Sequence, residues 1–104
     1  MLNAPMDLTR FEAKAGSVAD LLKAMGNARR LMILCKLVEH GEMRVGDLAR
    51  EVGLSQSACS QHLAKMRDEG HVDSRRESQT FWYRIADART ETLLATLYRL
   101  YCKD

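Results

Sequence analysis

The chain is poor in residues that restrict or cross-link a backbone, with one proline, six glycines and three cysteines among 104 residues. It also lacks a long apolar run. The longest covers only residues 31–35, whereas a membrane-spanning helix needs about 20 apolar residues. The first 25 residues carry three acidic side chains and no apolar segment, so we expect neither a membrane span nor a secretory signal. An odd cysteine count does not fit a disulfide framework. These absences predict a cytoplasmic protein with reduced thiols.

No charge of one sign dominates the composition. Sixteen basic and 14 acidic residues give a net charge of only +2, which excludes a protein that coats nucleic acid by bulk attraction. The hydrophobic share of 46% is ordinary for a folded chain and too high for a disordered one. The length fits one domain. We therefore predict a single domain over residues 1–104, with residues 1–10 irregular.

Apolar periodicity and capping residues predict four helices, a β-hairpin and a final helix. Asn27 and Ser55 are typical N-caps, and Gly41, Gly53 and Gly70 are typical helix stops. The expected helices cover about 11–25, 28–40, 45–52, 55–69 and 88 to the C-terminus, and the hairpin strands cover 71–76 and 80–85. The predicted fold class is mainly α with a β-hairpin wing, in the order ααααββα.

Residues 45–69 have the organisation of a helix-turn-helix. At 100° per residue, Cys59, Leu63 and Met66 form one apolar stripe on the second helix of this unit. The opposite face is slim and polar, which suits close approach to base edges in a major groove, whereas a merely solvated helix more often carries Glu–Lys pairs. The expected contacts with bases and phosphates from this helix are Ser55, Gln56, Ser57, Ser60, Gln61, His62 and Lys65.

The predicted hairpin adds cationic side chains beside this helix. Arg75 and Arg76 precede its tip and Gln79 follows it, where they are expected to contact the minor groove or the backbone phosphates. Glu77 lies beside them and counts against binding, and a solvated tip with incidental charge is the alternative.

The sequence resembles the ArsR/SmtB family of winged-helix repressors. The resemblance covers about residues 17–102 and is most specific in Ser60-Gln61-His62-Leu63, with a wing-like run over residues 75–83. It implies a homodimer built on helices at 17–25 and 88–102, which binds double-stranded operator DNA and releases it when an inducer acts. It implies no enzymatic activity.

The sequence departs from the metal-sensing members of that family. Their thiolate subtype has Cys-x-Cys where this chain has Val45-Gly46-Asp47. Their other common subtype places ligands along the final helix, where Asp87 is followed by Arg89, Thr92 and Ala95. A metal site needs three or four converging ligands. We therefore predict no metal site and no cofactor, and give the scattered His40, His62 and His71 no ligand role.

The cysteines instead resemble those of the family's dithiol subgroup, which senses persulfides and oxidants. The resemblance implies that Cys35 and Cys102 face each other and are joined by a disulfide or polysulfide bridge when reactive sulfur species act. Lys36 and Lys103 are candidates for lowering their thiol pKa values. Cys59, within the apolar stripe of residues 55–69, is expected to be structural.

Other inputs and functions stay open at this stage. The alternative input for such a regulator is reactive oxygen species, haem or a metal. A small thiol sulfurtransferase is a distant alternative, because the chain has no Cys-x-x-Cys motif and no glycine-rich anion loop. A winged helix that binds only protein is a fourth possibility, and it would have no affinity for an operator.

Overall fold

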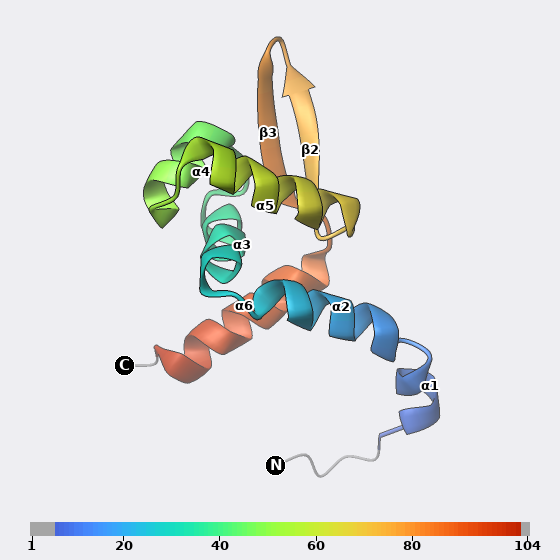
Figure 1. Cartoon of the computed structure of the whole chain (residues 1–104). Coiled ribbons are helices and arrows are strands. Elements are labelled where there is room, and N and C mark those ends of the chain that lie inside the picture. The colour runs from blue at the N-terminus through green and yellow to red at the C-terminus, as the bar shows by residue number, and fades with distance from the viewer. Residues whose placement is uncertain (1–5, 103–104) are drawn as a thin grey trace.

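The computed structural model describes residues 6–102. Within these residues, six helices and three short strands follow one another (Figure 1). Their bounds are α1 Leu8–Glu12, α2 Ala15–Met25, α3 Ala28–His40, β1 Met43–Arg44, α4 Val45–Val52, α5 Gln56–Asp68, β2 Val72–Glu77, β3 Thr80–Ile85 and α6 Ala88–Tyr101. The mainly α fold with a β-hairpin wing is confirmed, with α1 and β1 as additions to the predicted order.

Local capping chemistry explains why the helix boundaries follow the sequence closely. The Asn27 side-chain oxygen accepts hydrogen bonds from the backbone N–H groups of Arg29 and Arg30, at 3.0 and 3.1 Å, so α3 begins as predicted. Gly41 and Gly53 adopt φ values of +81° and +72°. Glycine adopts this conformation without steric cost, which lets α3 and α4 end at these two positions.

The prediction that residues 1–10 are irregular is wrong for residues 8–10, which belong to α1. The Asp7 side chain accepts a hydrogen bond from the Arg10 backbone N–H at 3.2 Å and caps this short helix. No residue of α1 is buried. A helix stabilised by a cap alone has no apolar periodicity, so the pattern analysis could not detect it. Residues 1–5 lie outside the described part of the chain.

The three strands form one antiparallel sheet in the order β1-β3-β2. Strand β1 pairs Met43 with Tyr83, and the β2–β3 hairpin closes at the pair Glu77 and Thr80. Ser78, in the two-residue turn, has a φ of +59°. The hairpin projects away from the helices as the wing (Figure 1).

The hydrophobic core is centred on α3 and is completed by α4, α5 and β2. Its fully buried side chains are Ile33, Leu34, Leu37, Leu48, Cys59, Leu63, Met66 and Val72. Helices α2 and α6 lie together at the end of the molecule remote from the wing (Figure 1). No helix in the described residues is long and apolar enough to cross a membrane.

Candidate nucleic-acid interface and thiol residues

Helix α5 has the two faces that the sequence predicts. Cys59, Leu63 and Met66 are completely buried against the core. The Ser55 hydroxyl oxygen accepts a hydrogen bond from the Ala58 backbone N–H at 3.1 Å, which fixes the N-terminus of the helix. Ser55, Gln56, Ser57, Gln61 and Lys65 are all exposed on the other side. These polar side chains are therefore accessible to a partner such as a DNA groove.

Two predicted contact residues, Ser60 and His62, are only partly exposed. Burial lowers the pKa of His62, and the nearby charges of Arg30 and Lys65 lower it further. The imidazole is therefore neutral at physiological pH. It offers one donor and one acceptor rather than a charge for a phosphate.

Helix α4 holds α5 at a fixed angle through a short connection. Leu54 donates its backbone N–H to the Ala49 carbonyl oxygen at 2.9 Å, across the left-handed Gly53. The Arg29 guanidinium on α3 donates to the Val52 carbonyl oxygen at 2.5 Å. This bond satisfies a carbonyl that the helix itself leaves unpaired. The helix-turn-helix and α3 are thus joined by bonds as well as by apolar packing.

On one face of the wing, Arg75 is engaged by acidic and aromatic neighbours. Its Nε and Nη2 donate to the two carboxylate oxygens of Glu42, each at 2.8 Å, and its Nη1 donates to Glu77 at 3.2 Å. Arg75 and Arg44 each lie 5.6 Å from the centre of the Trp82 ring, opposite it in register. A bidentate pair and a cation–π contact hold the guanidinium in place.

Arg76 lies on the other face of the same strand, because successive strand residues alternate. Its guanidinium is 5.8 Å from the Phe81 ring centre and donates to the Ser78 carbonyl oxygen at 2.8 Å. Gln79 is exposed at the tip. The structure therefore does not bring Arg75 and Arg76 together. Sequence analysis missed Glu42 and Arg44, which are placed beside Arg75 only by the pairing of three strands.

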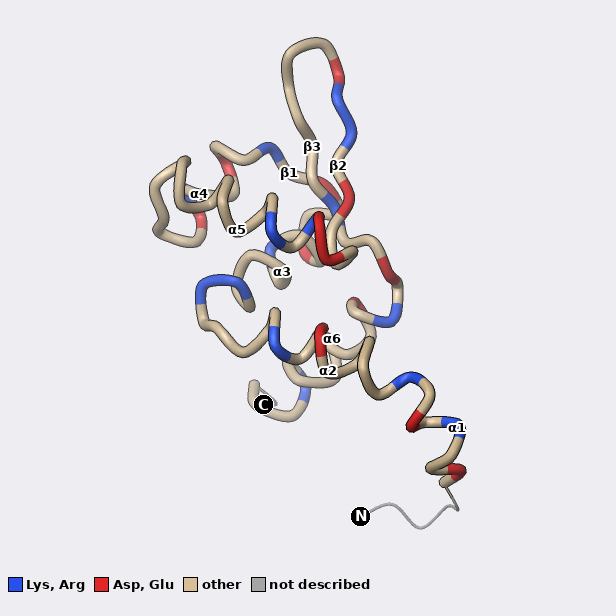
Figure 2. The backbone as a smooth tube through the Cα atoms, turned by 45° about the vertical axis from the view of Figure 1, so that its right-hand side comes forward, with Lys and Arg blue, Asp and Glu red and all other residues tan. Residues whose placement is uncertain are grey.

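Charges of both signs are interspersed along the backbone, and the tip of the wing carries none (Figure 2). On the wing itself, basic and acidic residues are neighbours on β2. This distribution favours recognition by individually placed side chains over attraction by bulk charge.

The three thiols lie in three different environments. Cys35 on α3 is half-buried and packs against the core, Cys59 is completely buried, and Cys102 is exposed at the end of α6. Burial raises the pKa of the Cys59 thiol to about 11, so this group stays protonated and unreactive. The expectation of a structural Cys59 agrees with its complete burial.

The expected lowering of the Cys35 thiol pKa by Lys36 is smaller than the opposing effect of burial. Burial raises the pKa of the Cys35 thiol, and the nearby Lys36 charge lowers it by a smaller amount. The Lys36 ammonium is itself paired with Glu39 at 3.2 Å and with Glu51 at 3.4 Å. Lys103, the corresponding neighbour of Cys102, lies outside the described residues.

The residues of the family's metal sites have other partners in this chain. Asp87 caps α6 by accepting the Arg89 backbone N–H at 2.9 Å, and it pairs with the Arg89 guanidinium at 2.6 Å. Hydrogen bonds from Arg89 lower the pKa of Asp87 to about 2. Asp47 pairs with Arg44 and Arg50. Within residues 6–102, one other group of three candidate metal ligands converges, formed by Glu39, His40 and Glu51.

Comparison with known proteins identifies the family. Residues 27–74 match the sequence model of a family described as bacterial regulatory protein, arsR family. The chain is 45% identical to the transcriptional activator HlyU of Vibrio cholerae over 100 residues, which are 96% of this chain and 92% of the relative. It is 46% identical to the transcriptional regulator YgaV of Escherichia coli over 96 residues, covering 92% and 97% of the two chains.

Solved structures agree with this assignment. The transcriptional repressor BigR from Xylella fastidiosa superposes with a TM-score of 0.85 at 37% identity, covering 95% of this chain and all of that one. Reduced HlyU from Vibrio cholerae superposes with a TM-score of 0.81 at 44% identity, covering 90% and 98%. These relatives are regulators of transcription rather than enzymes. The chain belongs to the ArsR family of bacterial transcriptional regulators, with a winged helix-turn-helix for binding DNA.

Proposed function

We propose that the protein is a homodimeric repressor that releases its operator when the Cys35 and Cys102 thiols are oxidised by reactive sulfur species. The observation that carries the DNA-binding part is the division of α5 into a fully buried apolar face and an exposed polar face. A helix that only needed solvation would have no use for exposed glutamine and serine side chains on a capped N-terminal half. In a major groove, these groups can donate to and accept from base edges.

The wing supplies contacts outside the major groove. Arg76 and Gln79 are exposed near the tip, where the minor groove or its phosphates would lie. Arg75 is exposed too, but it must exchange its Glu42 partner for a phosphate before it can bind DNA. We therefore assign Arg76 and Gln79 to direct contact and Arg75 to a contact that competes with an internal ion pair.

A second copy is the partner best suited to α2 and α6. Leu22 on α2 is 52% exposed, and Tyr98, Leu100 and Tyr101 on α6 are 67%, 71% and 82% exposed. An exposed apolar surface of this kind marks an interaction site. A related ArsR-type winged-helix domain from Mycobacterium bovis, 31% identical to this chain, is homodimeric. A two-fold dimer would present its two α5 helices to half-sites about 34–36 Å apart, one helical turn of DNA.

The accessibility of the thiols supports Cys35 and Cys102 as the sensing pair, since Cys59 has none. The exposed Cys102 thiolate would attack a sulfane sulfur atom of a polysulfide and break the S–S bond to the rest of that molecule. The rest leaves as a shorter polysulfide anion, and Cys102 becomes a persulfide. The Cys35 thiol would then attack the cysteine sulfur of that persulfide and release hydrogen sulfide. Two thiols lose two electrons, and one sulfane sulfur is reduced to hydrogen sulfide.

Operator binding is tested by selecting duplexes from a random DNA pool with the reduced protein. Fluorescence anisotropy then measures the affinity of the selected sequence and of a scrambled duplex at several salt concentrations. We expect the selected duplex to bind at least about a thousandfold more tightly than the scrambled one. Equal affinity for both duplexes, or no binding at low salt, would contradict the DNA-binding proposal.

The sensing step is tested with the same duplex after treatment of the protein with polysulfide or peroxide. We expect polysulfide to release the DNA from the wild type but not from Cys35→Ser or Cys102→Ser. Cys59→Ala is the matched control and should respond like the wild type. The intact mass after treatment counts the sulfur atoms inserted between the two thiols. If polysulfide still releases the DNA from Cys35→Ser, the thiol-switch proposal is contradicted, whereas the DNA-binding proposal is unaffected.

A further inference from the structure

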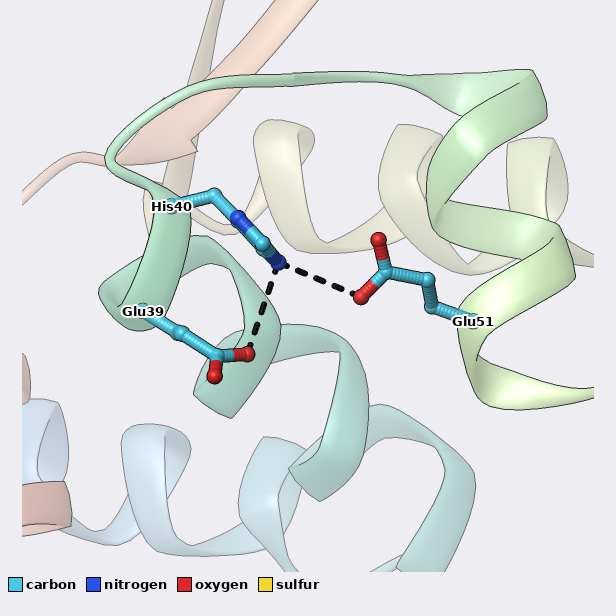
Figure 3. Close-up of side chains that lie close together, drawn as sticks. All are labelled: Glu39, His40 and Glu51. Atoms are coloured by element: carbon cyan, nitrogen blue, oxygen red, sulfur yellow. Dashed lines mark hydrogen bonds and ion pairs between the residues drawn. The ribbon is translucent and has the colours of Figure 1, made fainter.

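Three potential ligand atoms converge at the junction of α3 and α4. Glu39 and His40 end α3, and Glu51 lies in the last turn of α4 (Figure 3). His40 Nε2 lies 3.4 Å from Glu39 Oε1 and 3.2 Å from Glu51 Oε1. The three atoms all lie within 4.8 Å of one another. The tertiary fold therefore brings together ligands that are distant in sequence.

Two of the three separations are close to those between neighbouring ligand atoms in a tetrahedral coordination shell. Zinc binds imidazole nitrogen and carboxylate oxygen at about 2.0–2.1 Å, so neighbouring ligand atoms in a tetrahedron are about 3.3–3.4 Å apart. Both distances that involve His40 Nε2 match this edge length within the spread of 3.2–3.4 Å. One imidazole and two carboxylates leave a fourth position for water. The donor set excludes a purely thiophilic ion and suits zinc.

A cation is already held at this place by the fold. The Lys36 ammonium lies 3.2 Å from Glu39 Oε1 and 3.4 Å from Glu51 Oε1, the two oxygens that also contact His40. Lys36 would compete with a metal ion for these two oxygens.

The cluster is open to solvent on a concave surface. His40 and Glu51 line a pocket of about 340 Å³ that reaches Glu42 and Trp82 at the base of the wing. Glu39 is 60% exposed at its side chain and can move toward an ion without disturbing the core. An ion can enter from solvent, and the fourth position can hold a water molecule or a small anion.

We propose that Glu39, His40 and Glu51 form a binding site for a divalent zinc-like cation, with Lys36 as its internal competitor. The site does not use the ligand positions that the family resemblance implies, and its ligands share no residue with the thiol pair. An ion bound there would join the end of α3 to the end of α4. It would replace the ion pairs that Lys36 makes with a single coordination centre.

The test uses full-length Cys35→Ser/Cys102→Ser protein, stripped with a chelator, so that accessible thiols do not bind the ion. Zinc is titrated at neutral pH in competition with a chromophoric chelator. We expect one ion per chain with a dissociation constant in the micromolar range. His40→Ala should raise that constant at least about tenfold, because it removes the only nitrogen ligand. Glu91→Gln, an exposed glutamate on α6, is the matched control and should change nothing.

Lys36→Met gives the sharper result because it predicts a gain. Removing a unit charge about 4 Å from a divalent ion relieves about 2 kcal/mol of repulsion in water, which corresponds to about a thirtyfold lower dissociation constant. A constant that is unchanged or raised by Lys36→Met would overturn the proposal. So would zinc affinity weaker than millimolar, or binding that His40→Ala leaves intact. Histidine side-chain NMR signals supply a second readout, since zinc should shift those of His40 and leave those of His62 and His71 in place.

Discussion

The two ends of this molecule expose opposite kinds of surface. At one end, α5 and the wing present serine, glutamine, lysine and arginine side chains, and the large apolar residues of α5 are turned into the core. At the other end, the last turns of α6 leave Tyr98, Leu100 and Tyr101 mostly exposed, and only Thr90 and Leu94 of that helix are buried. The first surface suits a hydrated, charged duplex. The second suits an apolar partner such as a second copy.

The two ends also differ in how their side chains are held. The α5 and wing end is fixed by the Ser55 cap, the Arg75–Glu42 pair and the arginine–tryptophan contacts. The exposed aromatic residues of α6 have no comparable partners within residues 6–102. Groups that recognise a groove benefit from being placed before binding. Groups that form a dimer core are placed by the dimer itself.

The largest expected effect comes from adding charge to the apolar end. Leu100→Glu places a carboxylate in the proposed dimer interface, where it would be buried without a partner. We expect a monomer in light scattering at micromolar concentration and at least about a hundredfold loss of operator affinity, because one half-site contact is lost. Phe81→Glu on the wing is the control and should remain dimeric. A dimeric Leu100→Glu protein would break the proposed division between the two ends.

A smaller effect should separate base contacts from phosphate contacts on α5. Gln61→Ala should cost about 1–3 kcal/mol of discrimination against altered base pairs at one position of the operator. Lys65→Ala should weaken binding to all sequences alike and reduce the salt slope by about one. Anisotropy against a panel of single-base operator variants distinguishes the two outcomes. Identical profiles for both variants would contradict the assigned roles.

Breaking the Arg75–Glu42 ion pair is expected to raise the affinity for DNA. Glu42→Gln releases the guanidinium, which then becomes available to a phosphate. We expect operator affinity to rise a few-fold and the salt slope to grow by about one. Arg75→Ala should lower affinity and remove the effect of Glu42→Gln in the double variant. If Glu42→Gln instead weakens binding, Arg75 acts through its place on the sheet and makes no phosphate contact.

The same pair makes the stability of the wing depend on pH in the acid range. Hydrogen bonding from Arg75 lowers the pKa of Glu42 below its ordinary 4.5. The stabilisation is therefore fully present above pH 4.5 and is lost as the pH falls through the lower folded value. Hydrogen exchange of the β2 and β3 amides should accelerate in that acid range in the wild type. Glu42→Gln should abolish this acceleration, because its amide does not titrate.

The smallest effect is expected at the tip of the wing. Ser78 has a φ of +59° in the hairpin turn, a conformation that favours glycine over residues with a Cβ atom. Ser78→Gly should raise the melting temperature by about 1–3 °C and leave operator affinity within about twofold. Ser74→Gly on the preceding strand β2 is the control and should lower the melting temperature. A lower melting temperature for Ser78→Gly would show that the hydroxyl group stabilises the turn.

Sequence reasoning succeeded where the determinants are local. The Asn27 and Ser55 caps, the glycine stops and the stripe of Cys59, Leu63 and Met66 depend on neighbours within one helix. It failed for α1, which has a cap but no buried face. Sequence reasoning also could not identify the side chains that pair with the wing arginines. Glu42 lies 33 residues from Arg75, and only the pairing of β1, β3 and β2 brings them together.

The electrostatic environment of the thiols shows the same limit. Adjacency in sequence suggested that Lys36 activates Cys35, but the depth of Cys35 in the fold decides the direction of its pKa. Glu51 takes part of the Lys36 charge from a different helix. Which side chains oppose a charge depends on helix packing, and a linear pattern does not contain that information.

Bonds at both ends of α3 attach it to α4. Arg29 in its first turn binds the Val52 carbonyl oxygen, and Lys36 and His40 near its other end bind Glu51. Because these bonds lie near opposite ends of α3, they hold its orientation relative to α4. The Arg30 guanidinium also bonds α3 to α2, because it donates to the Ala24 carbonyl oxygen at 2.8 Å across the turn at Gly26 and Asn27. Helix α3 is therefore the element through which the apolar end of the molecule and the helix-turn-helix are joined.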